Sequence, residues 1–324
     1  MNRVIKKSVL FILSIVFLLS VLCGTFAIFN KTNSVIAKED KGVINVYLIG
    51  GQSNAVGYGT DHTGEVALKD SRYTTGYNNV LYYGEQERWT GSSAFTSFAP
   101  VKAGQGVDNS RSGAEIGIAS AIADKGEMNA IIKCAWGATH LYPDEVYNIS
   151  YAQGTWTSPS YIKENNISLA KNDMIGRMYT WWESTVKKGL DMLIADGYTP
   201  VIKGMWWMQG EAEMFTEKMS SAYDELLTAL ISDVRNSVSE ISGYDCSEMP
   251  FVFGLPIWNL KNSGTPPYQL DVRDNMQKVA NDTSIVNVDC VDCAGLFQHD
   301  DWHFDARGQK YLGEQFIAKL ETLT

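Results

Sequence analysis

Short runs of apolar, β-branched and aromatic residues recur along the chain. The strongest, VINVYLIGG at 43–51 and PVIKGMWWMQG at 200–210, are almost continuously apolar. Parallel strands covered by helices on both faces have this composition, because neither face meets water. We therefore predict strands at 43–51, 78–84, 129–137, 200–210, 250–257 and 284–290. Within them, Trp206 and Trp207 are expected to be core residues.

Between the strands, apolar residues recur at the three- and four-residue spacing of one helix face. We predict helices at 113–125, 174–196, 217–238, 267–281 and 306–322. Strands alternating with helices are typical of an α/β domain with a mostly parallel sheet. Two long polar and aromatic connections, 58–112 and 138–173, interrupt the alternation. Loops of that length inside a compact domain usually carry function.

The first residues differ from the rest of the chain. Arg3, Lys6 and Lys7 precede an apolar run that extends to Phe29, and a polar stretch follows. This layout predicts a signal peptide over 1–37, cleaved before Lys38, with an uncleaved membrane anchor as the alternative. We therefore expect a secreted or cell-surface protein that meets a membrane only through this segment. Residues 38–324 are predicted to form a single domain.

Composition is that of a globular, enzyme-sized protein, with 45% hydrophobic and 20% charged residues among 324. The formal net charge is −10, and the sequence pI is about 5.0. Nucleic acid is not an expected partner, because neutralising phosphates requires a cluster of basic residues.

Four cysteines follow the leader: Cys134, Cys246, Cys290 and Cys293. In an oxidising compartment this number allows one or two disulfides, but the sequence does not show the pairing. Cys290 and Cys293 form a lone CVDC, which lacks the second ligand pair of a zinc site. We interpret it as two cysteines at a strand end.

In an open parallel sheet, ligands bind beyond the carboxyl ends of the strands. The first predicted strand ends in GGQSNAVGYG, where two glycines allow a sharp turn before Ser53. A serine at this point is a candidate nucleophile, although taken alone it is more often a turn or cap residue.

A second candidate segment, HDDWHFDARG, precedes the last helix. Asp300 and His303 stand three residues apart, so the carboxylate can orient the imidazole as in a catalytic triad. Asp305 is the better cap for the following helix, which leaves Asp300 free for this role. His303 is therefore the candidate general base.

Two further segments offer hydrogen-bond donors for an oxyanion. Gln209 ends the predicted strand at 200–210, and Gly113 opens a predicted helix in RSGAEIGIA. A side-chain amide or a backbone N–H in such a place can stabilise a developing alkoxide. Each also has a simpler explanation, a loop hydrogen bond for Gln209 and an ordinary helix start for Gly113.

Together these segments resemble the sialate O-acetylesterase domain and carbohydrate esterase family 6, a branch of the SGNH hydrolases. The resemblance rests on GQSNA, GAEIG, WMQGEAE, VRDNMQ and DDWH, which stand in the order found in that family. It implies a flavodoxin-like three-layer α/β/α sandwich around a mostly parallel sheet. It also implies an enzyme that removes O-acetyl groups from carbohydrate, either a xylan-type polysaccharide or a sialic acid.

The resemblance implies a Ser53–His303–Asp300 triad and an oxyanion hole formed by Ser53, Gly113 and Gln209. It implies no metal and no organic cofactor. Further residues near these motifs, or aromatic residues in the long loops, are candidates for binding the acetylated sugar: Gln52, Asn54, Tyr58, Trp89, Trp136, His140, Tyr142, Trp156 and Glu211.

Two alternatives remain open. A glycoside hydrolase would use Glu211 and Glu213 as a carboxylate pair, although residues two apart do not reliably flank one bond. A non-catalytic surface protein would bind glycans through its aromatic loops. Neither alternative explains why Ser53, Asp300 and His303 occur together.

Overall fold

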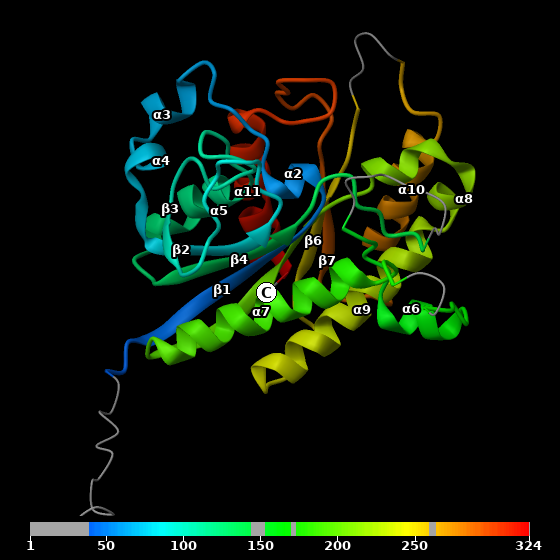
Figure 1. Ribbon diagram of the computed structural model, residues 1–324, viewed down its shortest axis with the longest axis horizontal. Helices are drawn as coiled ribbons and strands as arrows, with labels where there is room; N and C mark the ends of the chain where they lie inside the picture. The colour runs from blue at the N-terminus through cyan, green and yellow to red at the C-terminus, as the bar shows by residue number, and fades with distance from the viewer. Residues whose placement is uncertain (1–38, 144–152, 170–172, 259–263, 324) are drawn as a thin grey trace, which may run out of the picture. The chain divides into compact units, whose positions relative to one another are not determined.

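The computed structural model describes residues 39–143, 153–169, 173–258 and 264–323 (Figure 1). The predicted leader at 1–37 lies outside these residues. Residues Lys41–Thr324 group into one compact unit. Within the described part of the chain, none of the helices combines the length and apolar character needed to cross a bilayer.

The centre of the fold is a seven-stranded sheet in the order β3-β2-β4-β1-β5-β6-β7. β3 pairs antiparallel with β2, and the other pairs are parallel. The strands are β1 Gly42–Gly51, β2 Tyr77–Gln86, β3 Ala99–Val101, β4 Asn129–Ala135, β5 Tyr198–Met208, β6 Phe251–Leu255 and β7 Val288–Asp292.

Helices cover both faces of the sheet (Figure 1). One hydrophobic core lies under α7 Arg177–Ala195, α9 Tyr223–Ser242 and α10 Gln269–Ala280. The other lies under α5 Glu115–Ile122 and α11 Ala306–Leu323. Neighbouring residues of a strand enter opposite cores, as a pleated strand requires: Trp206 packs in one and Trp207 in the other, both fully buried. The predicted three-layer α/β/α sandwich is confirmed.

Most segment boundaries differ from the predictions by one to three residues, and three differences are larger. The segment predicted as one helix over 217–238 forms α8 Glu217–Ser221 and then α9. The strand predicted at 284–290 begins only at Val288, because Ser284 bonds back to Asp282 and Asn287 has a positive φ of 55°. The loops predicted at 58–112 and 138–173 contain short elements: α3 Glu65–Lys69, α4 Arg72–Thr75, β3, α6 Pro159–Glu164.

Four cysteines, Cys134, Cys246, Cys290 and Cys293, are free, so this structure contains none of the disulfides that the sequence allows among them. Burial raises the pKa of the Cys134 thiol, as expected for a residue inside a strand. Cys290 lies on β7 and Cys293 directly after it, as the strand-end interpretation predicted.

Candidate active site

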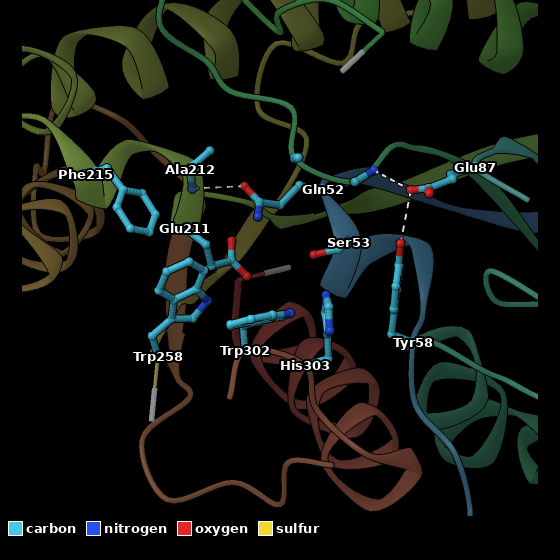
Figure 2. A pocket seen from close by; sticks show the side chains of 12 residues that line it. Gln52, Ser53, Tyr58, Glu87, Glu211, Ala212, Phe215, Trp258, Trp302 and His303 are labelled. Atoms are coloured by element: carbon cyan, nitrogen blue, oxygen red, sulfur yellow. Dashed lines mark hydrogen bonds between the residues drawn. The ribbon is translucent and has the colours of Figure 1, made fainter. Parts of the chain in front are cut away.

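A cavity of about 340 Å³ opens at the carboxyl edge of the sheet. It brings together residues from six separate segments, and Ser53 and His303 lie at its centre (Figure 2). Its lining consists of Gln52, Ser53, Tyr58, Glu87, Gly137, Ala138, Glu211, Ala212, Phe215, Trp258, Trp302 and His303.

Ser53 begins the short helix α2 Ser53–Val56 directly after β1. The turn into this helix depends on Gly51, which has a φ of 134° and whose Cβ, if present, would lie 2.0 Å from the Met208 carbonyl oxygen. A residue with a side chain cannot take this place. The hydroxyl of Ser53 reaches the pocket and forms no hydrogen bond with a described residue. Its N–H, at the start of a helix, is also available to a ligand.

His303 is buried beside Ser53, and its ring is fixed by Asp300. Asp300 Oδ2 lies 2.8 Å from His303 Nδ1, and Asp300 Oδ1 accepts the backbone N–H groups of Trp302 and His303 at 2.9 and 2.6 Å. Figure 2 shows a ring nitrogen of His303 pointing toward the Ser53 hydroxyl. With Nδ1 bound to the carboxylate, the nitrogen that faces Ser53 is available to accept a proton.

Burial and the contact between the two side chains determine the pKa values of His303 and Asp300. Burial lowers the pKa of His303 below its usual value, although Asp300 acts in the opposite direction. Burial alone would raise the pKa of Asp300, but hydrogen bonds from His299 and His303 hold it well below its usual range. A neutral imidazole next to an ionised carboxylate is the state in which histidine acts as a general base.

Tyr58 supports the ring of His303 from one side. The two rings stack with centroids 4.2 Å apart and an angle of 13° between their planes. The Tyr58 hydroxyl donates to Glu87 Oε2 at 3.3 Å. Tyr58, predicted to bind substrate, therefore lines the pocket and also restricts the imidazole.

Gln209 does not reach the pocket, contrary to its predicted role as an oxyanion donor. It is fully buried, and its Nε2 donates to Gln52 Oε1 at 3.2 Å and to Glu213 Oε2 at 2.5 Å. Gln52 Oε1 also accepts the Ala212 N–H at 3.3 Å. Because both donors occupy the oxygen of Gln52, its Nε2 is left facing the cavity, as Figure 2 shows. The amide donor of the pocket is Gln52.

Gly113 is also placed differently from the prediction. Its N–H donates to Glu115 Oε1 at 2.6 Å, and it does not line the cavity. Glu115 forms a fully buried ion pair with Lys133, at 2.8 Å. Gly113 thus packs against Gly57 at the end of α2, and its N–H is already bonded within the protein.

Gly137 and Ala138, which follow β4 and line the pocket, were not among the predicted site residues. Ala138 has a positive φ of 57°, and its N–H has no hydrogen-bond partner among the described residues. Gly137 donates its N–H to Glu87 Oε2 at 2.9 Å. The sequence does carry a signal, since these two residues stand at the carboxyl end of the strand predicted at 129–137, where ligands bind in an open parallel sheet.

Several predicted substrate-binding residues lie behind the pocket wall. Asn54 is buried and donates to Glu211 Oε1 at 2.8 Å and to the Trp302 carbonyl at 2.9 Å, so it positions two lining residues. Trp136 packs against Trp181. The remainder, His140, Trp89, Tyr142 and Trp156, are also outside the cavity lining.

The two carboxylates of the glycosidase alternative occupy different environments. Glu211 lines the pocket, whereas Glu213 is fully buried away from it and accepts from Gln209 and from the Leu141 N–H. Burial raises the pKa of each to about 7. Glu213 cannot flank a bond in the pocket, so the pair does not form a glycosidase site.

One wall of the pocket is aromatic. Trp258 lies between Phe215 and Trp302, with ring centroids 4.8 and 5.4 Å away. Phe215 and Trp302 are 38% and 40% exposed, so their faces are open to a ligand. These three residues come from separate segments, and none of them was a predicted site residue.

The described residues contain one group with the donor atoms of a metal site. His299, Asp300 and His303 offer atoms within 4.8 Å of one another. However, Asp300 Oδ2 is already bonded to His303 Nδ1 at 2.8 Å and approaches His299 Nε2 at 3.2 Å. The group fits a hydrogen-bonded base better than a ligand set.

Comparison with known proteins gives one family match. The model of the family described as "Carbohydrate esterase, sialic acid-specific acetylesterase" matches residues 43–322. Among curated protein sequences, none matches the chain significantly.

Solved structures share the fold at low sequence identity. NanS is 14% identical with a TM-score of 0.57, over 86% of this chain and 97% of its own. A carbohydrate acetylesterase from Xanthomonas citri is 15% identical with a TM-score of 0.55, over 86% of this chain but 56% of its own. A protein from Arabidopsis thaliana is 16% identical with a TM-score of 0.54, over 86% and 99%.

Proposed function

The chain belongs to the carbohydrate esterase family of sialic acid-specific acetylesterases and is a carbohydrate acetylesterase; we propose that it is an exported serine esterase using Ser53, His303 and Asp300. The observation that carries this proposal is the His303–Asp300 pair, with the ring directed at Ser53 in one cavity. Export is supported by the leader-like pattern of residues 1–37. Family membership sets aside the non-catalytic alternative.

In the proposed mechanism, His303 accepts the Ser53 proton as the serine oxygen attacks the acetyl carbonyl carbon. The tetrahedral intermediate then collapses, and His303 gives the proton to the departing sugar oxygen, which leaves as a hydroxyl. Water, deprotonated by the same histidine, attacks the acetyl carbon of the acyl-enzyme, and His303 returns that proton to the Ser53 oxygen as acetate leaves. Asp300 holds the imidazole orientation and stabilises its protonated form.

We assign the oxyanion hole to the Ser53 N–H, the Ala138 N–H and Gln52 Nε2. Each belongs to a residue that lines the cavity, and none has another hydrogen-bond acceptor among the described residues. Gln209 and the Ala212 N–H fix the orientation of Gln52. Donors fixed before the reaction stabilise a developing charge without reorganisation.

Covalent labelling tests the proposed nucleophile. An alkyl fluorophosphonate should inactivate the enzyme and leave one adduct, located on Ser53 by peptide mass spectrometry. Acetate release should be measured in parallel from acetylated xylan, an O-acetylated sialic acid and an aryl acetate. Release of acetate that the reagent does not stop, or an adduct elsewhere, would contradict the proposal.

Removing the amide of Gln52 should reveal its role. Gln52→Ala should lower kcat about 10²- to 10³-fold with a smaller change in KM, because the bond forms mainly in the transition state. Gln209→Met, which keeps the volume and removes only the support of Gln52, should cost less. A larger loss of kcat for Gln209→Met than for Gln52→Ala would indicate that Gln209, and not Gln52, is the oxyanion donor.

The pH dependence of kcat/KM should follow His303. The neutral ring is the base, so activity rises as pH passes the His303 pKa, which burial places below its usual value. Asp300→Asn removes the group that raises this pKa. It should therefore move the acid limb to lower pH and reduce kcat about 10⁴-fold.

The neighbouring half-buried Asp301 provides a matched control. Asp301→Asn should leave both the limb and kcat near the wild-type values. If the limb instead moves with Glu211→Gln and not with Asp300→Asn, the titrating group is Glu211.

A further inference from the structure

The two walls of the pocket differ in chemistry (Figure 2). Phe215, Trp258 and Trp302, here called the aromatic strip, lie on one side of Ser53. The strip begins next to His303, because Trp302 directly precedes it in the chain. The Asn54 side chain donates to the Trp302 carbonyl and so fixes the position of this residue. Exposed aromatic faces grouped at a pocket mark a ligand surface.

The flat faces of a sugar ring are rows of C–H groups, which pack well against indole and phenyl rings. The strip extends from the catalytic centre through Trp302 and Trp258 to Phe215, with successive centroids 5.4 and 4.8 Å apart. This is longer than one acetyl group requires. It fits a sugar unit, with room for the next unit of a chain.

Two carboxyl groups lie at the same pocket. Glu87 Oε2 accepts the Gly137 N–H and the Tyr58 hydroxyl. Glu211 Oε1 accepts from Asn54, while its Oε2 is buried without a hydrogen-bond partner. Glu211 lines the pocket and has one carboxyl oxygen without a partner among the described residues, so a ligand hydroxyl is a suitable donor to it. Sugar hydroxyls can donate to both groups.

A negatively charged ligand fits this arrangement poorly. A ligand carboxylate placed within about 6 Å of the Glu87 carboxylate loses roughly tenfold in affinity at the dielectric of a half-open site. The net charge of −10 adds a long-range repulsion of the same sign. The described residues lining the pocket include no lysine or arginine. Arg111, which lies 5.9 Å from the centroid of the Tyr58 ring and outside the lining, is paired with Asp108 at 3.8 Å.

We propose that the substrate is a neutral O-acetylated unit of an oligo- or polysaccharide, stacked on the aromatic strip with hydroxyls donating to Glu87 and Glu211, and that O-acetylated sialic acid is the weaker substrate. This inference rests on the proposed serine esterase function. It selects one of the two substrate classes that the sequence left open.

The test compares kcat/KM for four acetyl esters: an acetylated xylo-oligosaccharide, an O-acetylated sialic acid, the methyl ester of that sialic acid, and an aryl acetate. The oligosaccharide should exceed the free sialic acid at least about tenfold. The methyl ester, which has lost the carboxylate charge, should recover most of the difference. Glu87→Gln should improve the free acid several-fold more than the methyl ester.

The aromatic strip is tested with Trp258→Ala and with Tyr311→Ala, an exposed aromatic residue on α11 outside the cavity lining. Trp258→Ala should raise KM for the oligosaccharide about 3- to 10-fold. Tyr311→Ala should not. Equal effects of the two substitutions would overturn the stacking assignment.

The outcomes separate this inference from the proposed function. If the wild-type enzyme cleaves none of the four esters, the proposed function fails. If it cleaves the aryl acetate and prefers the free sialic acid, the esterase stands and the substrate inference is overturned. If methylation brings no gain, the charge argument is overturned.

Discussion

Replacing Ser53 with alanine should lower kcat for acetate release about 10⁶-fold. In the proposed mechanism the Ser53 oxygen forms the bond to the acetyl carbon, and the pocket offers no second hydroxyl among the described lining residues except that of Tyr58. Burial and Glu87 raise the pKa of Tyr58, so it is a poor replacement. The His303→Ala variant should lose a similar factor, because the serine hydroxyl is unreactive without its base.

The double variant provides the sharper measurement. Ser53→Ala with His303→Ala should be no more than a few-fold worse than either single change, because residues of one catalytic unit are not additive. Ser221→Ala, an exposed serine on α8, is the matched control and should retain wild-type kcat. Losses that multiply in the double variant would show that Ser53 and His303 act independently.

Sequence patterns predicted the fold well where the physical signal is local. Doubly covered strands need apolar residues on both faces, so their runs stand out, and the alternation with helices determines the layers. Boundaries were less accurate where a single side chain decides them. The start of β7, for example, is delayed by the Asp282–Ser284 turn, which apolar periodicity does not register.

The site was predictable where neighbours in sequence are neighbours in space. Asp300 and His303 form their hydrogen bond within one turn, so spacing alone indicated it. The choice between Gln52 and Gln209 was different. The two amides bond to each other, and only the burial of Gln209 and the direction of Gln52 show which one faces the cavity.

The aromatic strip could not be predicted from the sequence. Trp302 stands in the DDWH motif, but Phe215 and Trp258 come from the segments after β5 and β6. Their contact depends on how these two strand ends approach the start of α11. Composition could suggest that aromatic residues matter, but it could not select these three from the many in the chain.

The sequence around Lys133 could have predicted a buried ion pair. It is the one charged residue in the apolar strand NAIIKCA, and a lysine enclosed by two helical layers must find a partner. The structure provides two: Glu115 Oε2 at 2.8 Å and the Val56 carbonyl at 2.9 Å. Val56 is the last residue of α2, the helix that begins with Ser53. The buried pair therefore holds the end of α2, the helix that carries the proposed nucleophile.

Removing one partner of this pair should destabilise the protein strongly. Lys133→Met leaves the Glu115 carboxylate buried without its cation, which typically costs about 3–5 kcal/mol of unfolding free energy. Adding Glu115→Gln removes that charge while keeping an acceptor for the Gly113 N–H, so the double variant should recover at least about half of the loss. Urea unfolding monitored by tryptophan fluorescence measures both changes.

Measuring kcat shows whether Lys133 positions α2 in addition to stabilising the core. Because Lys133 bonds the Val56 carbonyl, the double variant should still show a lower kcat after most of its unfolding free energy has returned. Lys125→Met, which removes a surface ion pair with Glu321, is the matched control and should change stability by less than about 1 kcal/mol with kcat unchanged. If the double variant recovers stability and kcat together, Lys133 stabilises the core without positioning Ser53.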